Sequence, residues 1–231
     1  MIKYIQYSMF DAFDDPNIQT VVNTINCMGI MGKGLALEFK IRYREMFDDY
    51  TKRYKDGILK VGEPYIFKTN GKWILNFPTK NHWRYPSRLD FIESGLKFFS
   101  ENYKKNNIKS IAFPRLGCTA GGLKWEQVKP IMEKYMGDLK DIDIYVYLDQ
   151  KASEKEQAIL DIINSCNKVK VKGNFNLSDK QAVSLEGYIQ KKGSLKRVRD
   201  LLEIKGIGPA AYQKVLTKRN QAEIPQGEFL F

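Results

Sequence analysis

The chain has 231 residues and a net charge of +11, from 38 Lys and Arg residues against 27 Asp and Glu residues. Hydrophobic residues make up 43% of the sequence and aromatic residues 13%, which excludes an intrinsically disordered protein. No apolar run approaches the roughly 20 residues that a bilayer requires, so a membrane protein is excluded, and the basic charge favours a polyanionic partner.

The first residues lead directly into a strand-like pattern, so we expect no signal peptide. The three cysteines, Cys27, Cys118 and Cys166, are widely spaced, odd in number and without the spacing of metal ligands. The sequence therefore predicts a reduced, cytoplasmic protein with no bound metal and no cofactor.

Strand-like apolar runs alternate with helical patterns in the first two thirds of the chain. The strands are predicted at residues 2–6, 20–23, 64–67, 73–77, 109–113 and 143–148, and the helices at residues 34–43, 88–103 and 125–135. This alternation predicts a sheet covered by helices on both faces, which is a three-layer α/β/α domain.

The character of the sequence changes after Leu148, and we predict one domain over residues 1–150 and a second over residues 151–231. The second is predicted to be small and all-helical, with breaks near residues 172–176, 192–194 and 205–209. It carries 15 basic and 9 acidic side chains against 23 and 18 in the first domain, so it is about twice as positive per residue.

Two glycine-rich segments, residues 29–34 and 117–122, follow predicted strands. Ligands bind α/β sheets at such places, where backbone N–H groups at a helix start approach a diphosphate closely. One such segment is more often an ordinary turn, but two in one small sheet are placed to hold a pyrophosphate from both sides. Their spacing fits neither a Rossmann fingerprint nor a P-loop.

Residues 21–36, Val-Val-Asn-Thr-Ile-Asn-Cys-Met-Gly-Ile-Met-Gly-Lys-Gly-Leu-Ala, resemble the first ligand loop of the macrodomains, the ADP-ribose-binding family. Residues 76–84 and 116–125 are similar to motifs of the DarG subgroup, antitoxins that strip ADP-ribose from DNA thymines modified by the toxin DarT. The resemblance covers about residues 1–148. It implies a macrodomain with a mixed sheet, with ADP-ribose, ADP-ribosylated DNA and a DarT-like toxin as partners. The region after residue 150 does not resemble the toxin-binding domain of DarG.

Carried over by motif, the resemblance implies that two asparagines face the distal ribose and that the two glycine segments lie on either side of the diphosphate. The alternative for Asn23 is a turn former at a strand end, and for Lys33 a solvated surface position. Asp11 fits the adenine-contacting acid of many macrodomains only loosely. The expected ADP-ribose contacts are Asn23, Asn26, Gly29, Ile30, Met31, Gly32, Lys33, Gly34, Thr79, Leu116, Gly117, Cys118, Thr119, Ala120, Gly121, Gly122 and Leu123.

Lys80 resembles the catalytic lysine of the DarG subgroup. Ordinary glycosidases use two carboxylates at the oxocarbenium-like transition state, and no matching Asp/Glu pair lies near the glycine segments. A lysine has two routes: as an ammonium it stabilises or protonates the leaving base, and as a free amine it attacks the anomeric carbon or the opened aldehyde. The second route requires a lowered pKa, which burial or a nearby cation such as Arg84 provides.

The second glycine segment departs from related sequences. Terminal ADP-ribose glycohydrolases carry an aspartate where this chain has Gly121, and DarG-like sequences commonly have Gly-Asn-Gly-Gly at residues 119–122. The only histidine, His82, is expected to pack rather than to catalyse. Trp83 and Arg84, beside Lys80, are expected to contact nucleic acid, Trp83 either by stacking on the target base or merely by packing.

Residues 202–216 resemble a helix-hairpin-helix, in which a Gly-x-Gly turn opens a helix whose N–H groups bind a DNA phosphate. The alternative is an ordinary helical hairpin. The nucleic-acid contacts expected in this region are Lys196, Arg197, Arg199, Gly206 and Gly208.

The last residues, Gln226–Phe231, look like the short peptides that dock on DNA sliding clamps, or alternatively fold back on the protein.

For the whole chain the leading hypothesis is a DNA ADP-ribosyl glycohydrolase, with a thymine-linked substrate favoured. The alternatives are a glycohydrolase acting on proteins or on O-acetyl-ADP-ribose, and a non-catalytic ADP-ribose reader.

Overall fold

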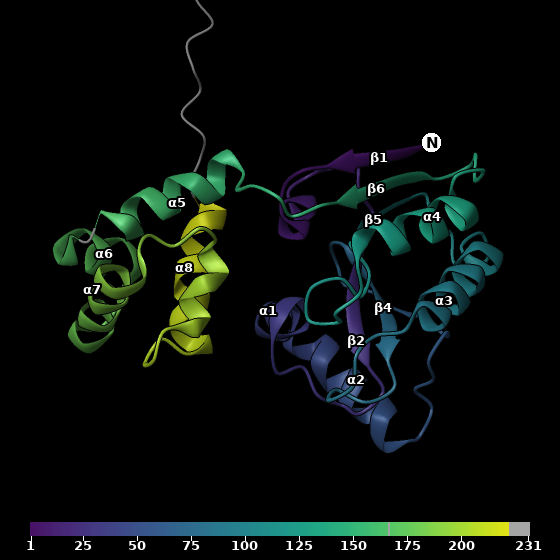
Figure 1. Cartoon of the computed structure of the whole chain (residues 1–231), viewed down its shortest axis with the longest axis horizontal. Coiled ribbons are helices and arrows are strands. Elements are labelled where there is room, and N and C mark those ends of the chain that lie inside the picture. The colour runs from purple at the N-terminus through teal and green to yellow at the C-terminus, as the bar shows by residue number, and fades with distance from the viewer. Residues whose placement is uncertain (166, 222–231) are drawn as a thin grey trace, which may run out of the picture. The chain divides into compact units, whose positions relative to one another are not determined.

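The computed structural model describes residues 1–165 and 167–221, and the chain divides into two compact units (Figure 1). The first unit is Met1–Lys151, and the second begins at Ala152. The boundary expected from the sequence, after residue 150, lies one residue before this division.

The first unit is built on a six-stranded sheet with the order β1-β6-β5-β2-β4-β3. Every pair of neighbouring strands is parallel except β3 and β4, which are antiparallel, so the sheet is mixed. The strands are β1 (Ile2–Ile5), β2 (Thr20–Asn26), β3 (Tyr65–Phe67), β4 (Trp73–Lys80), β5 (Ser110–Pro114) and β6 (Asp143–Tyr147).

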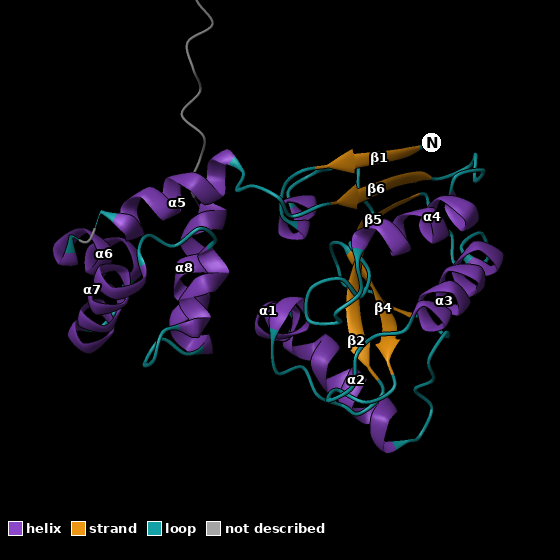
Figure 2. Ribbon diagram, viewed as in Figure 1, coloured by secondary structure: helices purple, strands orange, loops and turns teal. Residues whose placement is uncertain are grey.

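Helices cover both faces of this sheet (Figure 2). Because successive side chains of a strand point to opposite faces, Val22 of β2 belongs to one apolar cluster and Val21 and Ile25 belong to the other. The first cluster includes α3 (Leu89–Asn102) and α4 (Trp125–Met136), and the second includes η1 (Met9–Phe13), α1 (Gly34–Arg42) and α2 (Arg44–Lys55). The predicted α/β/α architecture with a mixed sheet is confirmed.

The helix α2 was not expected from the sequence. It buries only Met46 and Tyr50, and its remaining residues are mostly charged or half-exposed. Three ion pairs at i,i+4 spacing, Arg44–Asp48, Lys52–Asp56 and Arg53–Asp49, support it along its length. Its apolar residues Met46, Phe47, Tyr50 and Tyr54 recur at helical spacing, but the charged residues between them outnumber them.

The strand β4 extends to Lys80, three residues beyond its predicted end at Phe77. Pro78 lies within it, where a proline usually argues against a strand. The edge strand β3 pairs only with Ile74–Asn76, so the later part of β4 is paired on the side of β2 alone. Lys80 is therefore the last residue of a strand, in register with Asn26 of β2.

The second unit is helical where the structure describes it. Its elements are α5 (Glu154–Asn164), α6 (Lys168–Phe175), α7 (Asp179–Lys192), η2 (Val198–Glu203) and α8 (Pro209–Gln221). The chain breaks after α7 and before α8 as expected, but α6 continues through most of the break expected at residues 172–176 and ends against the left-handed Asn176. Among the described residues, no helix is long and apolar enough to cross a membrane.

Candidate functional site

Three loops meet at one edge of the sheet because they follow three neighbouring parallel strands. The first loop (residues 27–33) joins β2 to α1, the aromatic loop (residues 81–88) joins β4 to α3, and the second loop (residues 115–124) joins β5 to α4. Since β5, β2 and β4 are adjacent and parallel, their carboxyl ends lie side by side. This is the edge at which α/β sheets bind ligands.

The charge of these loops has one sign. They contain no Asp or Glu, whereas five basic residues occur in them: Lys33, Arg84, Arg88, Arg115 and Lys124. Lys80 adds a sixth cation at the end of β4. A site with this composition favours an anionic ligand.

Asn26 shapes the first loop from beneath. Its Nδ2 donates to the carbonyl of Ile30 at 2.6 Å, and its Oδ1 accepts from the N–H of Met28 at 2.9 Å and from the hydroxyl of Tyr50 at 3.0 Å. The side chain is buried. The amide is therefore occupied in holding the loop, which differs from the expectation that it faces a ribose.

Asn23 lies inside the sheet rather than at its edge. It is fully buried, and its Nδ2 donates to Oδ1 of Asn76, the residue directly opposite it on β4, at 2.9 Å. Its amide nitrogen therefore joins β2 to β4, while its Oδ1 has no hydrogen-bond partner among the described residues, and the ribose contact stays a prediction. Five further predicted contacts are also buried: Met31, Thr79, Leu116, Gly117 and Gly121.

The first and second loops approach each other at the start of α1. A Cβ added to Gly34 would lie 3.7 Å from the Cβ of Ala120. No side chain caps the N-terminus of α1, so its first N–H groups face the site without a competing acceptor from a cap. The predicted contacts that are exposed on these two loops are Ile30, Gly32, Lys33, Gly34, Thr119, Ala120 and Gly122, and Gly29, Cys118 and Leu123 are partly exposed.

The second loop is folded too tightly for a side chain at position 121. A Cβ on Gly121 would lie 2.1 Å from the carbonyl oxygen of Gly117 and 2.5 Å from Oγ of Ser87. The carbonyl of Gly121 accepts from the N–H of Ser87 at 2.9 Å, which joins the second loop to the aromatic loop. The aspartate that related glycohydrolases carry here does not fit this loop conformation.

Lys80 lies where the loops come together. Its Nζ donates to the carbonyl of Ala120 in the second loop at 2.6 Å. Partial burial, followed by the positive charge of Lys33, lowers the pKa of Lys80 from its ordinary value. The cation that acts on Lys80 is therefore Lys33 rather than Arg84. Within the described residues, no Asp or Glu forms an ion pair with Lys80.

The cysteines of the site are unreactive. Burial raises the pKa of both Cys27 and Cys118 to about 11, so each is a neutral thiol near pH 7.

The part of the chain that the structure describes contains no group of three or more His, Cys, Asp or Glu residues placed to hold a metal ion. A cavity of about 350 Å³ lies between β3, β4 and α3, and none of the three loops lines it.

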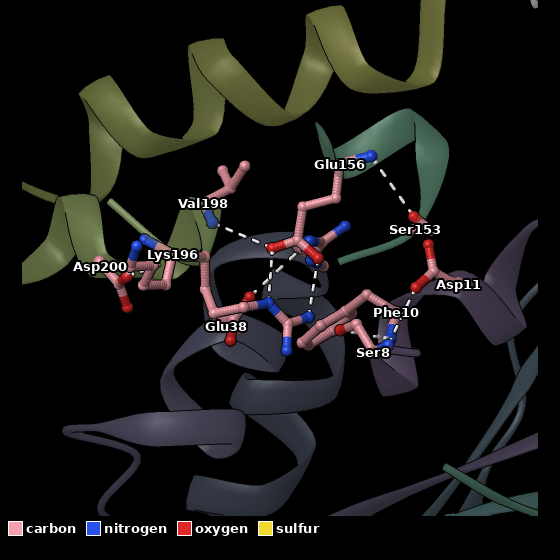
Figure 3. A network of polar contacts seen from close by, with 11 residues as sticks. Ser8, Phe10, Asp11, Glu38, Ser153, Glu156, Lys196, Val198 and Asp200 are labelled. Carbon is pink, nitrogen blue, oxygen red and sulfur yellow. Dashed lines mark hydrogen bonds and ion pairs between the residues drawn. The ribbon is translucent and has the colours of Figure 1, made fainter. Parts of the chain in front are cut away.

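Asp11, the loose candidate for an adenine contact, has a local structural role. Its Oδ2 accepts from the backbone N–H of Ser8 at 3.0 Å, and the hydroxyl of Ser8 accepts from the N–H of Phe10 (Figure 3). Together these two hydrogen bonds cap η1.

In the second unit, a turn that contains Gly206 and Gly208 precedes α8, and the helix-hairpin-helix stays a prediction. Gly206 has a φ of 92° and Gly208 directly precedes the helix, and both glycines are exposed. The element before the turn is the short 3₁₀ helix η2 rather than an α-helix. The turn is closed by the N–H of Ile207, which donates to the carbonyl of Ile204 at 3.0 Å.

Arg197 faces inward instead of toward a nucleic acid. Its guanidinium pairs with the buried carboxylate of Glu156 at 2.7 Å. The same carboxylate accepts from the N–H of Val198 at 2.9 Å, and both of these residues are labelled in Figure 3. This differs from the expectation for Arg197, because a guanidinium held by a buried carboxylate is part of the core of the unit. Lys196 is exposed as expected, and Arg199 is half-buried. The proposed clamp peptide, Gln226–Phe231, lies outside the described residues.

Comparison with known proteins places this site in a family context. The Macro domain family model matches residues 22–132. The chain is 44% identical over 133 residues to a Mycobacterium tuberculosis protein named DNA ADP-ribosyl glycohydrolase, and 37% identical over 150 residues to a Thermosipho africanus protein named DNA ADP-ribosyl transferase-DNA ADP-ribosyl glycohydrolase fusion protein. These matches cover 56% and 57% of the chain, and the chain spans 38% of the length of each relative.

Solved structures give the same result. The macrodomain of Mycobacterium tuberculosis DarG matches with a TM-score of 0.59 and 41% identity, covering 64% of this chain and 97% of that one. Thermosipho africanus DarTG in complex with ADP-ribose matches with a TM-score of 0.59 and 36% identity, covering 64% of this chain and 41% of that one.

The close approach at Gly121 gives a prediction about stability. In Gly121→Ala the added Cβ overlaps the carbonyl of Gly117, so the loop must move, at a cost of about 1–3 kcal/mol. We expect the melting temperature to fall by ~2–8 °C. Gly71→Ala is the control, because the nearest atom to its added Cβ lies 3.8 Å away. Equal melting temperatures for the two variants, measured by circular dichroism, would contradict the loop conformation described.

Proposed function

The chain belongs to the macrodomain family, and we propose that it removes ADP-ribose from ADP-ribosylated DNA. The observation that carries the proposal is Lys80, whose Nζ lies between the two ligand loops with a lowered pKa and without a carboxylate partner among the described residues. A merely solvated lysine has neither the contact with the second loop nor the lowered pKa. The relatives named DNA ADP-ribosyl glycohydrolase support DNA as the macromolecule that carries the ADP-ribose.

The diphosphate of ADP-ribose is assigned to the space between the first and second loops. The uncapped N-terminus of α1 begins at Gly34, beside Ala120, and supplies N–H donors and a favourable potential for an anion. Lys33 adds a positive charge directly before this helix. The exposed residues of both loops are the proposed contacts, and the buried Asn26 holds the first loop in place.

The reaction is assigned to Lys80 by one of two routes. In the first, the free amine attacks the anomeric carbon, the base leaves with the electrons of the glycosidic bond and takes up a proton, and water then hydrolyses the lysine adduct. In the second, the ammonium gives its proton to the leaving base while water attacks the anomeric carbon. A lowered pKa assists both routes, since it increases the fraction of free amine and the acidity of the ammonium.

Three observations favour DNA over the other substrates. The relatives carry DNA in their names, the aromatic loop directly follows Lys80, and the second unit has an excess of basic residues. A protein substrate or O-acetyl-ADP-ribose explains neither the basic unit nor the exposed rings beside the lysine. A thymine-linked ADP-ribose, which has an N-glycosidic bond, is the substrate we propose first.

The second unit is assigned to DNA binding through the hairpin before α8. The exposed Gly206 and Gly208 leave the start of the helix accessible to a phosphate, and Lys196 and Lys205 are exposed nearby in sequence.

A DNA ADP-ribosyl transferase is the protein partner proposed, because the Thermosipho africanus relative joins such an enzyme to the glycohydrolase in one chain.

Removal of the lysine amine tests the catalytic assignment. Lys80→Ala should abolish release of ADP-ribose from a thymine-modified oligonucleotide while leaving the affinity for free ADP-ribose within a few-fold, because the lysine is assigned to chemistry. Lys80→Arg retains a cation but neither forms a covalent adduct nor gives up a proton, so activity retained by this variant would indicate that the positive charge alone is sufficient. Full turnover by Lys80→Ala in a chromatographic release assay would contradict the assignment.

The pH dependence of the reaction should report the environment of Lys80. The pH profile of kcat/KM reflects groups of the free enzyme, and we expect a midpoint below 10.5. Lys33→Gln removes one of the two causes that lower this pKa, so the midpoint should move upward. If the midpoint is the same in Lys33→Gln and the unsubstituted protein, the Lys33 charge does not act on the catalytic group.

The hairpin assignment is tested with two glycines that have open space around them. Gly208→Asp places a carboxylate directly before α8, where it caps the helix and repels a phosphate. We expect weaker DNA binding and a salt-dependence slope reduced by about 0.7–0.9 for each phosphate that the protein no longer neutralises. Gly187→Asp makes the same charge change on α7 and is the control. Equal slopes for the two variants would argue against the hairpin.

A further inference from the structure

The aromatic loop presents a surface that the chemistry at Lys80 does not use. Trp83 and Tyr85 are 41% and 68% exposed, and they lie three and five residues after Lys80. Both rings lie against the ring of His82, with centroids 5.9 Å from it for Trp83 and 5.3 Å for Tyr85, so the three rings form one aromatic patch.

This loop is held at both ends before any partner arrives. At its start, the N–H of Cys27 donates to the carbonyls of Lys80 and Asn81 at 3.1 and 3.3 Å. At its end, the N–H of the buried Ser87 donates to the carbonyl of Gly121 at 2.9 Å. The rings are therefore presented in a fixed geometry, which reduces the entropy cost of binding.

His82 organises the middle of the loop. Its carbonyl accepts from the N–H of Tyr85 and its Nδ1 from the N–H of Arg84, both at 3.2 Å. Its ring stacks with that of Trp83, with centroids 5.9 Å apart and an angle of 19° between the planes. The histidine thus supports the exposed tryptophan from one side and has no catalytic contact.

Arg84 adds an available positive charge to this patch. Its guanidinium carbon lies 4.9 Å from the centroid of the Trp83 ring. Within residues 1–165 and 167–221, the guanidinium forms no ion pair. An aromatic ring with an unneutralised cation over it matches a nucleotide, which combines a flat base with a phosphate.

We propose that the aromatic loop binds an unpaired base next to the ADP-ribosylated nucleotide of single-stranded DNA. Trp83 stacks on that base and Arg84 contacts a neighbouring phosphate. In a duplex each base is already stacked on both sides, so the loop selects single strands over duplexes. The inference rests on the proposed function for the identity of the polymer.

Binding of an unmodified oligonucleotide tests this proposal without requiring hydrolysis. The full chain is titrated with a fluorescently labelled oligothymidylate and with the matching duplex. We expect tighter binding of the single strand, and a loss of about five- to 150-fold in Trp83→Ala, the equivalent of ~1–3 kcal/mol for one stacked base. Trp83→Phe keeps an aromatic face and should retain most of the affinity.

The arginine is tested against a matched neighbour in the same loop. Arg84→Gln removes a charge that has no ion-pair partner in the described structure and should weaken binding several-fold. Arg88→Gln makes the same change at a guanidinium already paired with Asp90 at 2.8 Å, and should change the affinity less than twofold. Equal effects of the two substitutions would show a general charge effect and overturn the role of Arg84.

Two results would overturn the proposal as a whole. One is unchanged single-strand affinity in Trp83→Ala, which would leave the patch to a protein partner, and the other is equal affinity for single strand and duplex. Release of ADP-ribose from a modified oligonucleotide is measured in parallel. A chain that binds single strands through Trp83 but releases no ADP-ribose would contradict the proposed function and leave this proposal standing.

Discussion

The parallel pairing of β5, β2 and β4 is the constraint on which the site depends. Because neighbouring parallel strands end at the same edge, three segments that are far apart in the sequence begin one strand spacing, ~5 Å, from the next, and the outer two begin ~10 Å apart. The hydrogen bond between Asn23 and Asn76 and the register of Asn26 with Lys80 fix the relative height of β2 and β4. A slip of that register would displace Lys80 from the second loop, which it contacts through Ala120.

Much of the fold follows from the sequence because it is local. The strand runs, the alternation of Val21, Val22 and Ile25 between two cores, and the amphipathic α3 are all patterns within a few residues. The helix α2 was not predicted because charged residues, several of them in ion pairs, outnumber the apolar residues that recur at helical spacing in it. The end of β4 was not predicted because a proline usually argues against a strand. Pro78 is tolerated here because β3 is short and pairs only with Ile74–Asn76, and residues close to Pro78 in the sequence do not reveal the length of β3.

The site was predictable in its segments and less so in its individual side chains. The glycine loops and Lys80 lie together at the carboxyl ends of β2, β4 and β5, because each of the segments that carried the resemblance follows or ends one of these strands. Asn23 and Arg197 have structural roles because their partners, Asn76 and Glu156, are distant in sequence. A buried polar group needs such a partner, and no local pattern reveals whether a given Asn or Arg has found one.

The contact between Ser87 and the second loop limits how this protein can change through evolution. A side chain at position 121 meets both the Gly117 carbonyl and the Ser87 hydroxyl, so position 121 is not free to vary alone. A lineage that acquires an acidic residue at 121 must first rebuild the loop or open space at 87, and the intermediate carries the cost of a strained loop. The packing of the second loop therefore forms an epistatic barrier between the present site, with glycine at position 121, and a site that pairs Lys80 with an aspartate at that position.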